Sequence, residues 1–299
     1  MMPACVAYDY RMDRRVRALV GAMVGLALCL GLATARGEQQ PPPAPGSDPL
    51  HRPLDQILEV NVRDGLVYYR ALQSTRGALD RYAASLNVPT ATYDGWSREA
   101  KMAFWVNAYN TFVLQTVVSR YPIRGTSGAY PASSIRQIPG AFDQTKHRAA
   151  GRSVTLDEIE KTVLAEFKEP RLSLALGRGA VGSGRLRSEA YTAARLPEQL
   201  EAIQQEFVTR QRLFKVDRSA GMVSPTPILS WHEAEFVAAY GDKADARFAT
   251  RSSIERALIA FITPNLLPLE KEFVDENKFR VAYQEFDWRL NDLTGGRIE

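Results

Sequence analysis

Residues 98–121, REAKMAFWVNAYNTFVLQTVVSRY, decide the fold that the sequence predicts. Apolar side chains occur at almost every helical position of this stretch, so no face of the helix is left for water. Pro122 follows and ends the helix, because proline lacks an amide hydrogen and clashes with the preceding turn. A membrane span is the weaker alternative, because Asn107, Asn110 and Gln115 lie inside the stretch. We therefore predict a long helix buried at the centre of a domain.

Shorter patterns on both sides of this helix predict further elements. Helical periodicity occurs at 54–58, 79–86, 196–207, 232–240 and 253–262, and strand-like runs occur at 66–69, 171–176 and 279–286. Thr155 and Glu158 have the spacing of a capping box, which predicts a helix start. Residues 213–216 and 222–224 flank a turn and predict a β-hairpin. The fold class that follows is α+β: a mostly helical single domain with a buried central helix and a small sheet that includes the hairpin.

The composition and the charge exclude several classes of protein. The chain has 299 residues, of which 45% are hydrophobic and 24% are charged, as in an ordinary globular protein. A net charge of +4 is too small to indicate nucleic-acid binding.

The three histidines, His51, His147 and His232, do not have the spacing of metal ligands, so we expect no metal and no cofactor. We expect His232 to cap or pack a helix and His147 to be exposed.

The first residues have the pattern of a secretory signal peptide. Met12 is followed by a basic stretch, an apolar run and an A-x-A cleavage signal that ends at Ala35. This predicts a bacterial protein in the periplasm or outside the cell, with no membrane span after cleavage; the alternative is an uncleaved anchor. Cys5 and Cys29 would leave with the peptide. The expected organisation is an over-called start plus signal peptide over 1–35, a proline-rich linker over 36–53, a globular domain over 54–293 and a tail over 294–299.

Glu160 is the first candidate for a functional residue. One face of the helix that starts after Thr155 carries the apolar side chains Leu156, Ile159, Val163 and Phe167. Glu160 falls in the middle of that face, and a buried carboxylate is costly unless it is paired. Two interpretations stay open. Either Glu160 bonds a buried backbone group or an arginine and holds the fold together, or it has a catalytic or ligand-binding role.

A glycine-rich loop is the second candidate. Residues 177–182, GRGAVG, match G-x-G-x-x-G, but no helix with an apolar face follows, so we reject a dinucleotide site. Arg178, Arg185 and Arg187 beside the free amide groups of such a loop predict an anion-binding site. The alternative is a solvated basic loop.

Five blocks of the sequence, taken in order, resemble the domain-of-unknown-function family 547. They are FWVNAYN at 104–110, GRSVTLDEIE at 151–160, the stretch 170–193, the stretch 228–236 and FDWRLN at 286–291. In typical members, histidines stand at the positions of Lys161 and Ser173, and cysteines stand at those of Arg178 and Ser183. The resemblance therefore implies a Cys–His nucleophilic site in the family, and a divergent member here that lacks its thiols and imidazoles.

These observations predict an exported, degenerate, non-catalytic protein that binds a small ligand, an anion or an envelope partner at the cleft around the glycine-rich loop. The ligand-binding candidates are Arg171, Arg178, Ser183, Arg185, Arg187, Asn107 and Asn110. One alternative is a hydrolase or transferase that uses Glu160 with Ser183 or a bound water. The other is a structural envelope protein without a pocket.

Overall fold

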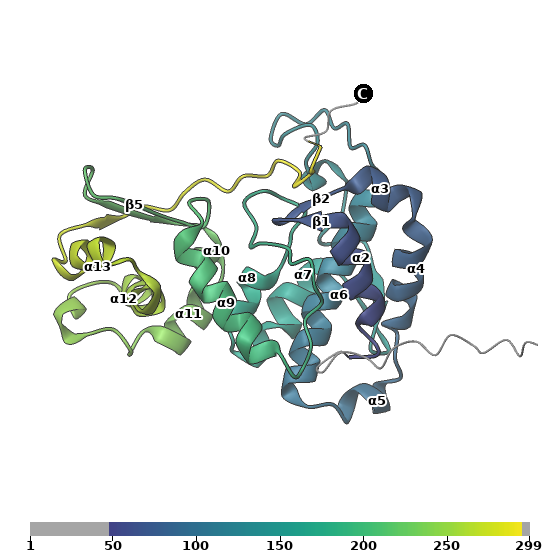
Figure 1. The fold of residues 1–299 in the computed structure, drawn as a ribbon, viewed down its shortest axis with the longest axis horizontal. Coiled ribbons are helices and arrows are strands. Elements are labelled where there is room, and N and C mark those ends of the chain that lie inside the picture. Colours follow the sequence, from purple (N-terminus) through teal and green to yellow (C-terminus); the bar gives the residue numbers. More distant parts are fainter. Residues whose placement is uncertain (1–47, 295–299) are drawn as a thin grey trace, which may run out of the picture. The chain divides into compact units, whose positions relative to one another are not determined.

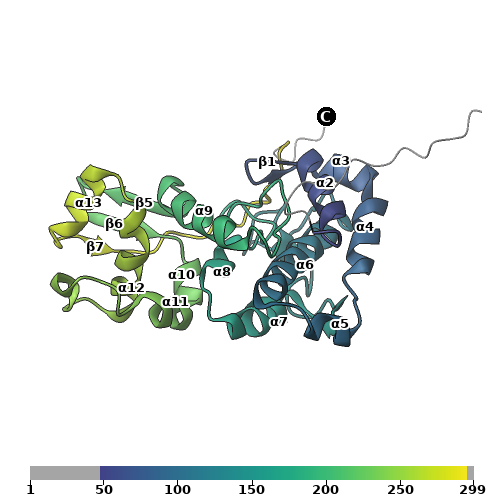
Figure 2. The same cartoon turned by 60° about the horizontal axis from the view of Figure 1, so that its bottom comes forward.

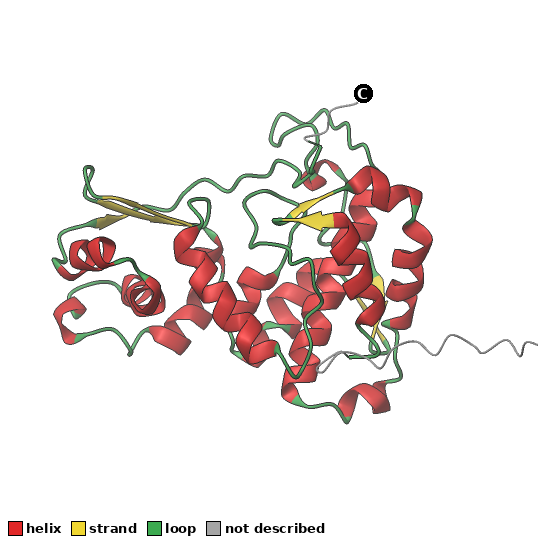
Figure 3. Cartoon of the chain, viewed as in Figure 1, coloured by secondary structure: helices red, strands yellow, loops and turns green. Residues whose placement is uncertain are grey.

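The protein is described by a computed structural model that covers residues 48–294. The predicted signal peptide, the linker up to residue 47 and the tail from residue 295 lie outside the described residues. Helices make up most of the regular structure, and the strands are short (Figures 1 and 3). The predicted fold class, a mostly helical α+β domain, is confirmed.

The helices follow each other along the whole described part of the chain (Figure 1). They are α2 (Arg52–Asn61), α3 (Tyr69–Ser74), α4 (Arg76–Ser85), α5 (Thr90–Asp94), α6 (Arg98–Val118), α7 (Leu156–Glu158), α8 (Arg171–Ala175), α9 (Leu196–Thr209), α10 (Ile228–Trp231), α11 (Glu233–Tyr240), α12 (Ser253–Ile262) and α13 (Pro268–Asp275). Short 3-10 or π turns lie at Ile135–Gln137, Ile159–Val163, Ala165–Phe167, Ala246–Phe248 and Thr263–Asn265.

The long helix α6 is the centre of the core, as the sequence predicts. Ser97 begins it, because its side chain accepts a hydrogen bond from the amide of Ala100 at 3.1 Å. From Met102 to Val118 nearly every side chain is buried, because α3, α4, α7 and α8 pack around it (Figure 2). The helix ends at Val118, shortly before Pro122. Within residues 48–294, none of the helices combines the length and the apolar character that a bilayer crossing needs.

Three small sheets complete the fold. In the first, β1 (Val62–Arg63) pairs antiparallel with β2 (Leu66–Val67), and in the second, β3 (His147–Ala149) pairs antiparallel with β4 (Arg152–Val154). The third contains the predicted hairpin, β5 (Phe214–Asp217) and β6 (Met222–Pro225), with Phe214 opposite Pro225. The strand β7 (Arg280–Val281) adds to β6 in parallel. It is shorter than the predicted 279–286.

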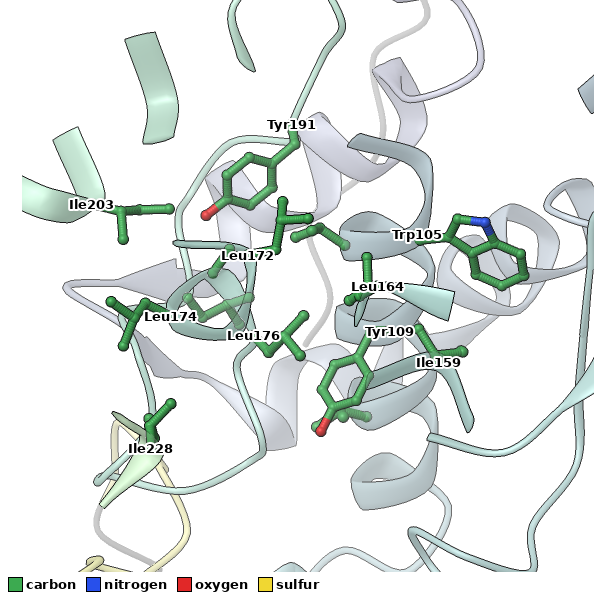
Figure 4. Packing of buried hydrophobic residues seen from close by; sticks show 14 of the residues in the cluster. Trp105, Tyr109, Ile159, Leu164, Leu172, Leu174, Leu176, Tyr191, Ile203 and Ile228 are labelled. Carbon is green, nitrogen blue, oxygen red and sulfur yellow. The ribbon is translucent and has the colours of Figure 1, made fainter. Parts of the chain in front are cut away.

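Two of the local predictions are wrong. The stretch 171–176, predicted as a strand, forms α8, because Pro170 has helical dihedral angles and the hydroxyl of Ser173 donates to its carbonyl at 2.7 Å. A short run such as Leu172 and Leu174 suits a buried strand or a buried helix equally well. Figure 4 shows these leucines among the side chains of the core. His147, expected to be exposed, is half-buried in β3, with its ring stacked 4.3 Å from that of Phe112.

Candidate functional site

Glu160 lies on an irregular turn after a well-defined helix start. The predicted capping box is present: Glu158 N–H donates to the Thr155 hydroxyl at 3.1 Å, and Thr155 N–H donates to the Glu158 carboxylate at 2.7 Å. After α7 the chain continues as a π turn, Ile159–Val163, which changes the direction of the following side chains relative to an α-helix. The side chain of Glu160 is buried, as predicted, and the residue is 7% exposed.

The buried carboxylate of Glu160 is fully paired. Its Oε1 accepts hydrogen bonds from Nη2 and Nε of Arg178 at 2.5 and 3.2 Å. Its Oε2 accepts one from the hydroxyl of Tyr109 at 3.0 Å, and Nε2 of His232 lies 3.0 Å from Oε1. We call Tyr109, Glu160, Arg178 and His232 the Glu160 cluster. Its members come from α6, the π turn, the glycine-rich loop and the junction between α10 and α11.

The surroundings of Glu160 and Tyr109 shift the pKa values of both groups away from neutral pH. Burial alone would raise the pKa of Glu160, but the charge of Arg178 and the hydrogen bond with His232 lower this pKa far below its usual range. Burial, together with the charge of Glu160, raises the pKa of Tyr109 well above its usual value. Glu160 is therefore ionised and Tyr109 is protonated at neutral pH. A carboxylate with so low a pKa is a weak general base.

Arg178 is the structural partner of Glu160, rather than part of a solvated loop. Its residue is 2% exposed, and its guanidinium also donates to the carbonyl groups of Ser173 and Leu176, at 3.1 and 3.3 Å. Its backbone amide donates to the hydroxyl of Ser183 at 3.0 Å. Ser183 is itself buried, and among the described residues its hydroxyl makes no hydrogen bond with a histidine. The prediction of a solvated basic loop is wrong for Arg178.

His232 has a different environment from the one expected. It occupies the N-cap position of α11, but its side chain makes no capping hydrogen bond. Instead Nε2 faces Glu160, and Nδ1 lies 3.6 Å from a carboxylate oxygen of Glu235. The residues His232 and Glu160 are 72 positions apart in the chain, so no local pattern could have predicted their contact.

The other predicted arginines do not converge on Glu160. Arg171 forms a bidentate ion pair with Glu169 at 2.8 and 2.9 Å. Arg185 and Arg187 both pair with Glu206 on α9. The predicted joint anion site of Arg178, Arg185 and Arg187 is therefore not assembled as proposed.

The two predicted asparagines connect α6 to neighbouring backbone. Asn107 donates to the carbonyl of Tyr191 at 2.8 Å and accepts from the amide of the same residue at 2.9 Å. Asn110 donates to the carbonyl of Ala175 at 3.2 Å and accepts from the amide of Gly177 at 2.8 Å. Both ends of each amide are used in this way, which fits a structural role better than a ligand-binding one.

A cavity of about 350 Å³ opens beside the Glu160 cluster. Its lining comes from segments far apart in the chain and consists of Arg136, Phe142, Asp157, Glu160, Lys161, Arg178, Trp231, His232 and Trp288. Of the predicted ligand-binding candidates, only Arg178 is among them. The aromatic side was not predicted as a site, because its members belong to three separate segments without a shared motif.

Aromatic rings and one arginine form the open side of this pocket. The guanidinium carbon of Arg136 lies 4.3 Å from the ring centre of Trp288 and 4.4 Å from that of Phe142. Trp231 is 46% exposed, and its ring is nearly parallel to that of Trp288, at 6.3 Å and 19°. The rings hold the guanidinium by cation–π interactions and leave its planar edge available for hydrogen bonds.

The cations of the pocket differ in how they are paired. Lys161 pairs with Asp157 at 2.7 Å, and Arg178 and His232 contact Glu160. Arg136, in contrast, makes no ion pair with any carboxylate of residues 48–294. No group of three or more potential ligands in the described part of the chain is arranged to hold a metal ion. The arrangement can attract an anion and stack a flat group beside it.

A comparison with protein families matches residues 93–208 to the family described as "Protein of unknown function, DUF547". The matched segment contains Tyr109, Glu160 and Arg178, whereas His232 and Trp288 lie beyond it. No curated protein and no solved structure matches the chain.

The departures from the family pattern collect around Arg178. Its side chain contacts Ser173, and its backbone contacts Ser183, while Lys161 lines the same pocket. The resemblance implies histidines at the positions of Lys161 and Ser173. It implies cysteines at the positions of Arg178 and Ser183. Arg178 therefore stands, paired and buried, where the resemblance implies a thiol.

Proposed function

We propose that the protein is exported and binds a small anion with a flat apolar group, without catalysing a reaction on it. The proposal starts from the match of residues 93–208 to the DUF547 family model. The proposed export rests on the signal-peptide pattern from Met12 to Ala35. The proposed binding rests on the pocket beside the Glu160 cluster.

The environment of Arg136 carries the proposal. A guanidinium presents a planar set of donors that matches carboxylate and phosphate groups. Arg136 is held against the rings of Phe142 and Trp288, yet it has no carboxylate partner among the described residues. The exposed ring of Trp231 offers a surface on which a planar group of the same ligand can stack.

The chemistry of Glu160 and Ser183 supports binding over hydrolysis. Both carboxylate oxygens of Glu160 already accept hydrogen bonds, and its low pKa makes it a poor acid or base at neutral pH. A serine hydroxyl needs an adjacent base to act as a nucleophile. The Ser183 hydroxyl contacts the amide of Arg178 and no imidazole within the described residues. The presence of a pocket also argues against a purely structural envelope protein.

Tryptophan fluorescence tests the proposed ligand class, because two tryptophans line the pocket. Benzoate, indole-3-acetate and phenyl phosphate would be titrated against the purified protein, with benzyl alcohol and acetate as partial ligands. We expect the aromatic anions to change the fluorescence at far lower concentration than either partial ligand. Arg136→Gln should abolish this difference, and Arg218→Gln, at an exposed position of the β5–β6 turn, should preserve it. Equal binding by the wild type and Arg136→Gln would contradict the proposal.

Two further measurements address export and catalysis separately. Deleting residues 12–35 should keep the protein inside the cells that otherwise export it, which fractionation measures directly. An esterase and peptidase panel that compares the wild type with Glu160→Gln tests the hydrolase alternative. Turnover by the wild type that is lost in a variant whose melting curve shows it to be folded at the assay temperature would favour that alternative.

A further inference from the structure

A second group of cations lies outside the pocket. Arg185 and Arg187 follow the glycine-rich loop, and Arg210 and Arg212 follow α9. We call these four residues the arginine cluster. None of them lines the pocket beside the Glu160 cluster.

Acidic partners balance only part of this charge. The Glu206 carboxylate accepts hydrogen bonds from Nε of Arg185 at 2.9 Å and from Nη2 of Arg187 at 3.2 Å, and Nε of Arg210 lies 3.8 Å from it. Three arginines therefore share one glutamate. Asp64, whose side chain is 71% exposed, pairs with Arg210 at 2.5 Å.

Glu189 adds little to this balance. It lies 3.7 Å from Arg187, and it also pairs with Arg195 at 2.8 Å, which is outside the cluster. Glu189 and Arg195 cancel each other, and Asp287, which also interacts with Arg212, is cancelled by Arg289. The four guanidinium groups of the arginine cluster are therefore left with the two carboxylates of Glu206 and Asp64. The cluster has an excess of about two positive charges by this count.

Arg212 is the member without a partner. Its side chain makes no hydrogen bond and no ion pair with any residue from 48 to 294, and its buried Nε is one of the unsatisfied donors of that region. Burial and the positive charges of Arg210 and Arg185 lower the pKa of Arg212, and the charges of Asp64 and Glu206 offset this only in part. A half-buried cation among like charges, with an unpaired donor, is unfavourable unless an anion accompanies it.

Glycine at position 65 allows two of these arginines to approach the β1–β2 turn. Gly65 has a φ of +84°, which favours glycine, and a Cβ there would lie 3.0 Å from Cγ of Arg185 and 3.6 Å from Nη2 of Arg212. Nη2 of Arg212 and the aliphatic part of the Arg185 side chain thus both lie next to the backbone of Gly65.

We propose that Arg185, Arg210 and Arg212 bind the oxyanion of a phosphate group, either free or in a phospholipid headgroup. A free phosphate or a phosphate monoester carries up to two negative charges and the phosphodiester of a lipid headgroup carries one, so either offsets excess charge of the arginine cluster. The phosphate oxygens can accept hydrogen bonds from the donor groups that Arg212 leaves unpaired. This site is independent of the pocket proposed above, because the two share no residue.

Calorimetry and thermal melting with inorganic phosphate test this site on the full chain. We expect phosphate to bind and to raise the melting temperature beyond what sodium chloride does at equal ionic strength. Arg212→Gln should weaken phosphate binding by about 10- to 100-fold, the usual loss for a hydrogen bond to a charged group. Arg212→Lys, which keeps the charge but loses the planar donors, should be intermediate. Arg218→Gln is the matched control and should bind like the wild type.

The behaviour without phosphate separates binding from a structural role. Because Arg212 is close to like charges, Arg212→Gln should melt at the same temperature as the wild type or higher when phosphate is absent. A lower melting temperature there, or unchanged phosphate affinity in Arg212→Gln, would overturn the proposal. So would an effect of phosphate no larger than that of chloride. Arg136→Gln should bind phosphate at this site normally, so failure of the pocket proposal leaves this result intact.

Sedimentation with lipid vesicles distinguishes the two sources of phosphate. Phosphatidylcholine vesicles with and without phosphatidylglycerol would be compared for the wild type and Arg212→Gln. Binding that needs phosphatidylglycerol and Arg212, and that inorganic phosphate displaces, indicates the headgroup. Phosphate binding without vesicle binding indicates a free phosphate or a soluble phosphate ester. The absence of both contradicts the proposal.

Discussion

Neutralising Glu160 should reveal how much the Glu160 cluster contributes to folding. Glu160→Gln keeps the size of the side chain but removes the charge that pairs with Arg178, which is 2% exposed. Arg178 would then be a buried cation without a counterion. Breaking a buried ion pair in this way costs about 3–5 kcal/mol. That is a large part of the roughly 5–15 kcal/mol by which a domain is stable.

Chemical denaturation at pH 7, followed by tryptophan fluorescence, measures this loss. Lys161→Gln in the next position is the matched control, because its side chain is 65% exposed and its ion pair with Asp157 is worth less than about 1 kcal/mol. Arg178→Met combined with Glu160→Gln should lose less stability than the sum of the single variants, because neither charge is then left alone. A loss below about 1 kcal/mol for Glu160→Gln would refute the reasoning, since only an exposed pair behaves that way.

The pH dependence of the same variant has a definite sign. The pKa of Glu160 in the folded protein is below its ordinary value of 4.5, so the folded state binds fewer protons there than the unfolded state. The stability from Glu160 is therefore fully present above pH 4.5 and is lost as the pH falls through the folded-state pKa. The wild type and Glu160→Gln should converge in acid. A difference between them that stays constant down to strongly acidic pH would contradict this account.

Three other predictions concern the scaffold. Burial lowers the pKa of His147 from 6.5 to about 4, so stability should fall as the pH drops from 6.5 to 4, and His147→Phe should reduce this slope in denaturation measured across that range. Asn107→Ala should lose about 1–3 kcal/mol for each of the two backbone groups that its amide satisfies, measured by urea unfolding. Asn107→Asp should lose at least as much at neutral pH, because it would bury a carboxylate against the carbonyl oxygen of Tyr191. Gly184→Ala should lower the melting temperature strongly or prevent folding, because its Cβ would lie 1.7 Å from the carbonyl oxygen of Leu174, whereas Gly128→Ala meets nothing within 4 Å and should be silent.

Local patterns account for the parts of the fold that the sequence predicts well. The helix α6, the capping box of Thr155 and Glu158 and the β5–β6 hairpin depend on residues close together in the chain. The strand predicted at 171–176 is wrong, because a few apolar residues in a row fit two kinds of buried element. The preceding Pro170, with its helical dihedral angles, favours the helix.

The site was predictable only in part, because its residues are far apart in the chain. Helical periodicity indicates that Glu160 is buried, and burial indicates that it is paired. Its partners could not be identified, because Arg178 is 18 positions away and His232 is 72 positions away, and only the tertiary fold joins them. Arg171, one of the predicted ligand-binding candidates, pairs with Glu169 nearby and not with Glu160.

The pairing inside the Glu160 cluster supports the proposal that the pocket binds a ligand and does not catalyse a reaction. A catalytic group needs a pKa near the working pH and an unoccupied atom that faces the substrate. Glu160 has neither, because Arg178 and Tyr109 occupy its oxygens and its pKa is held low. The same pairing leaves the inner end of the pocket close to neutral, so an anion that enters is attracted to Arg136 at the aromatic side. The negative charge of a bound ligand would thus pair with Arg136 and not with Arg178. The ion pair between Glu160 and Arg178, which stabilises the fold, would be preserved when the pocket is filled.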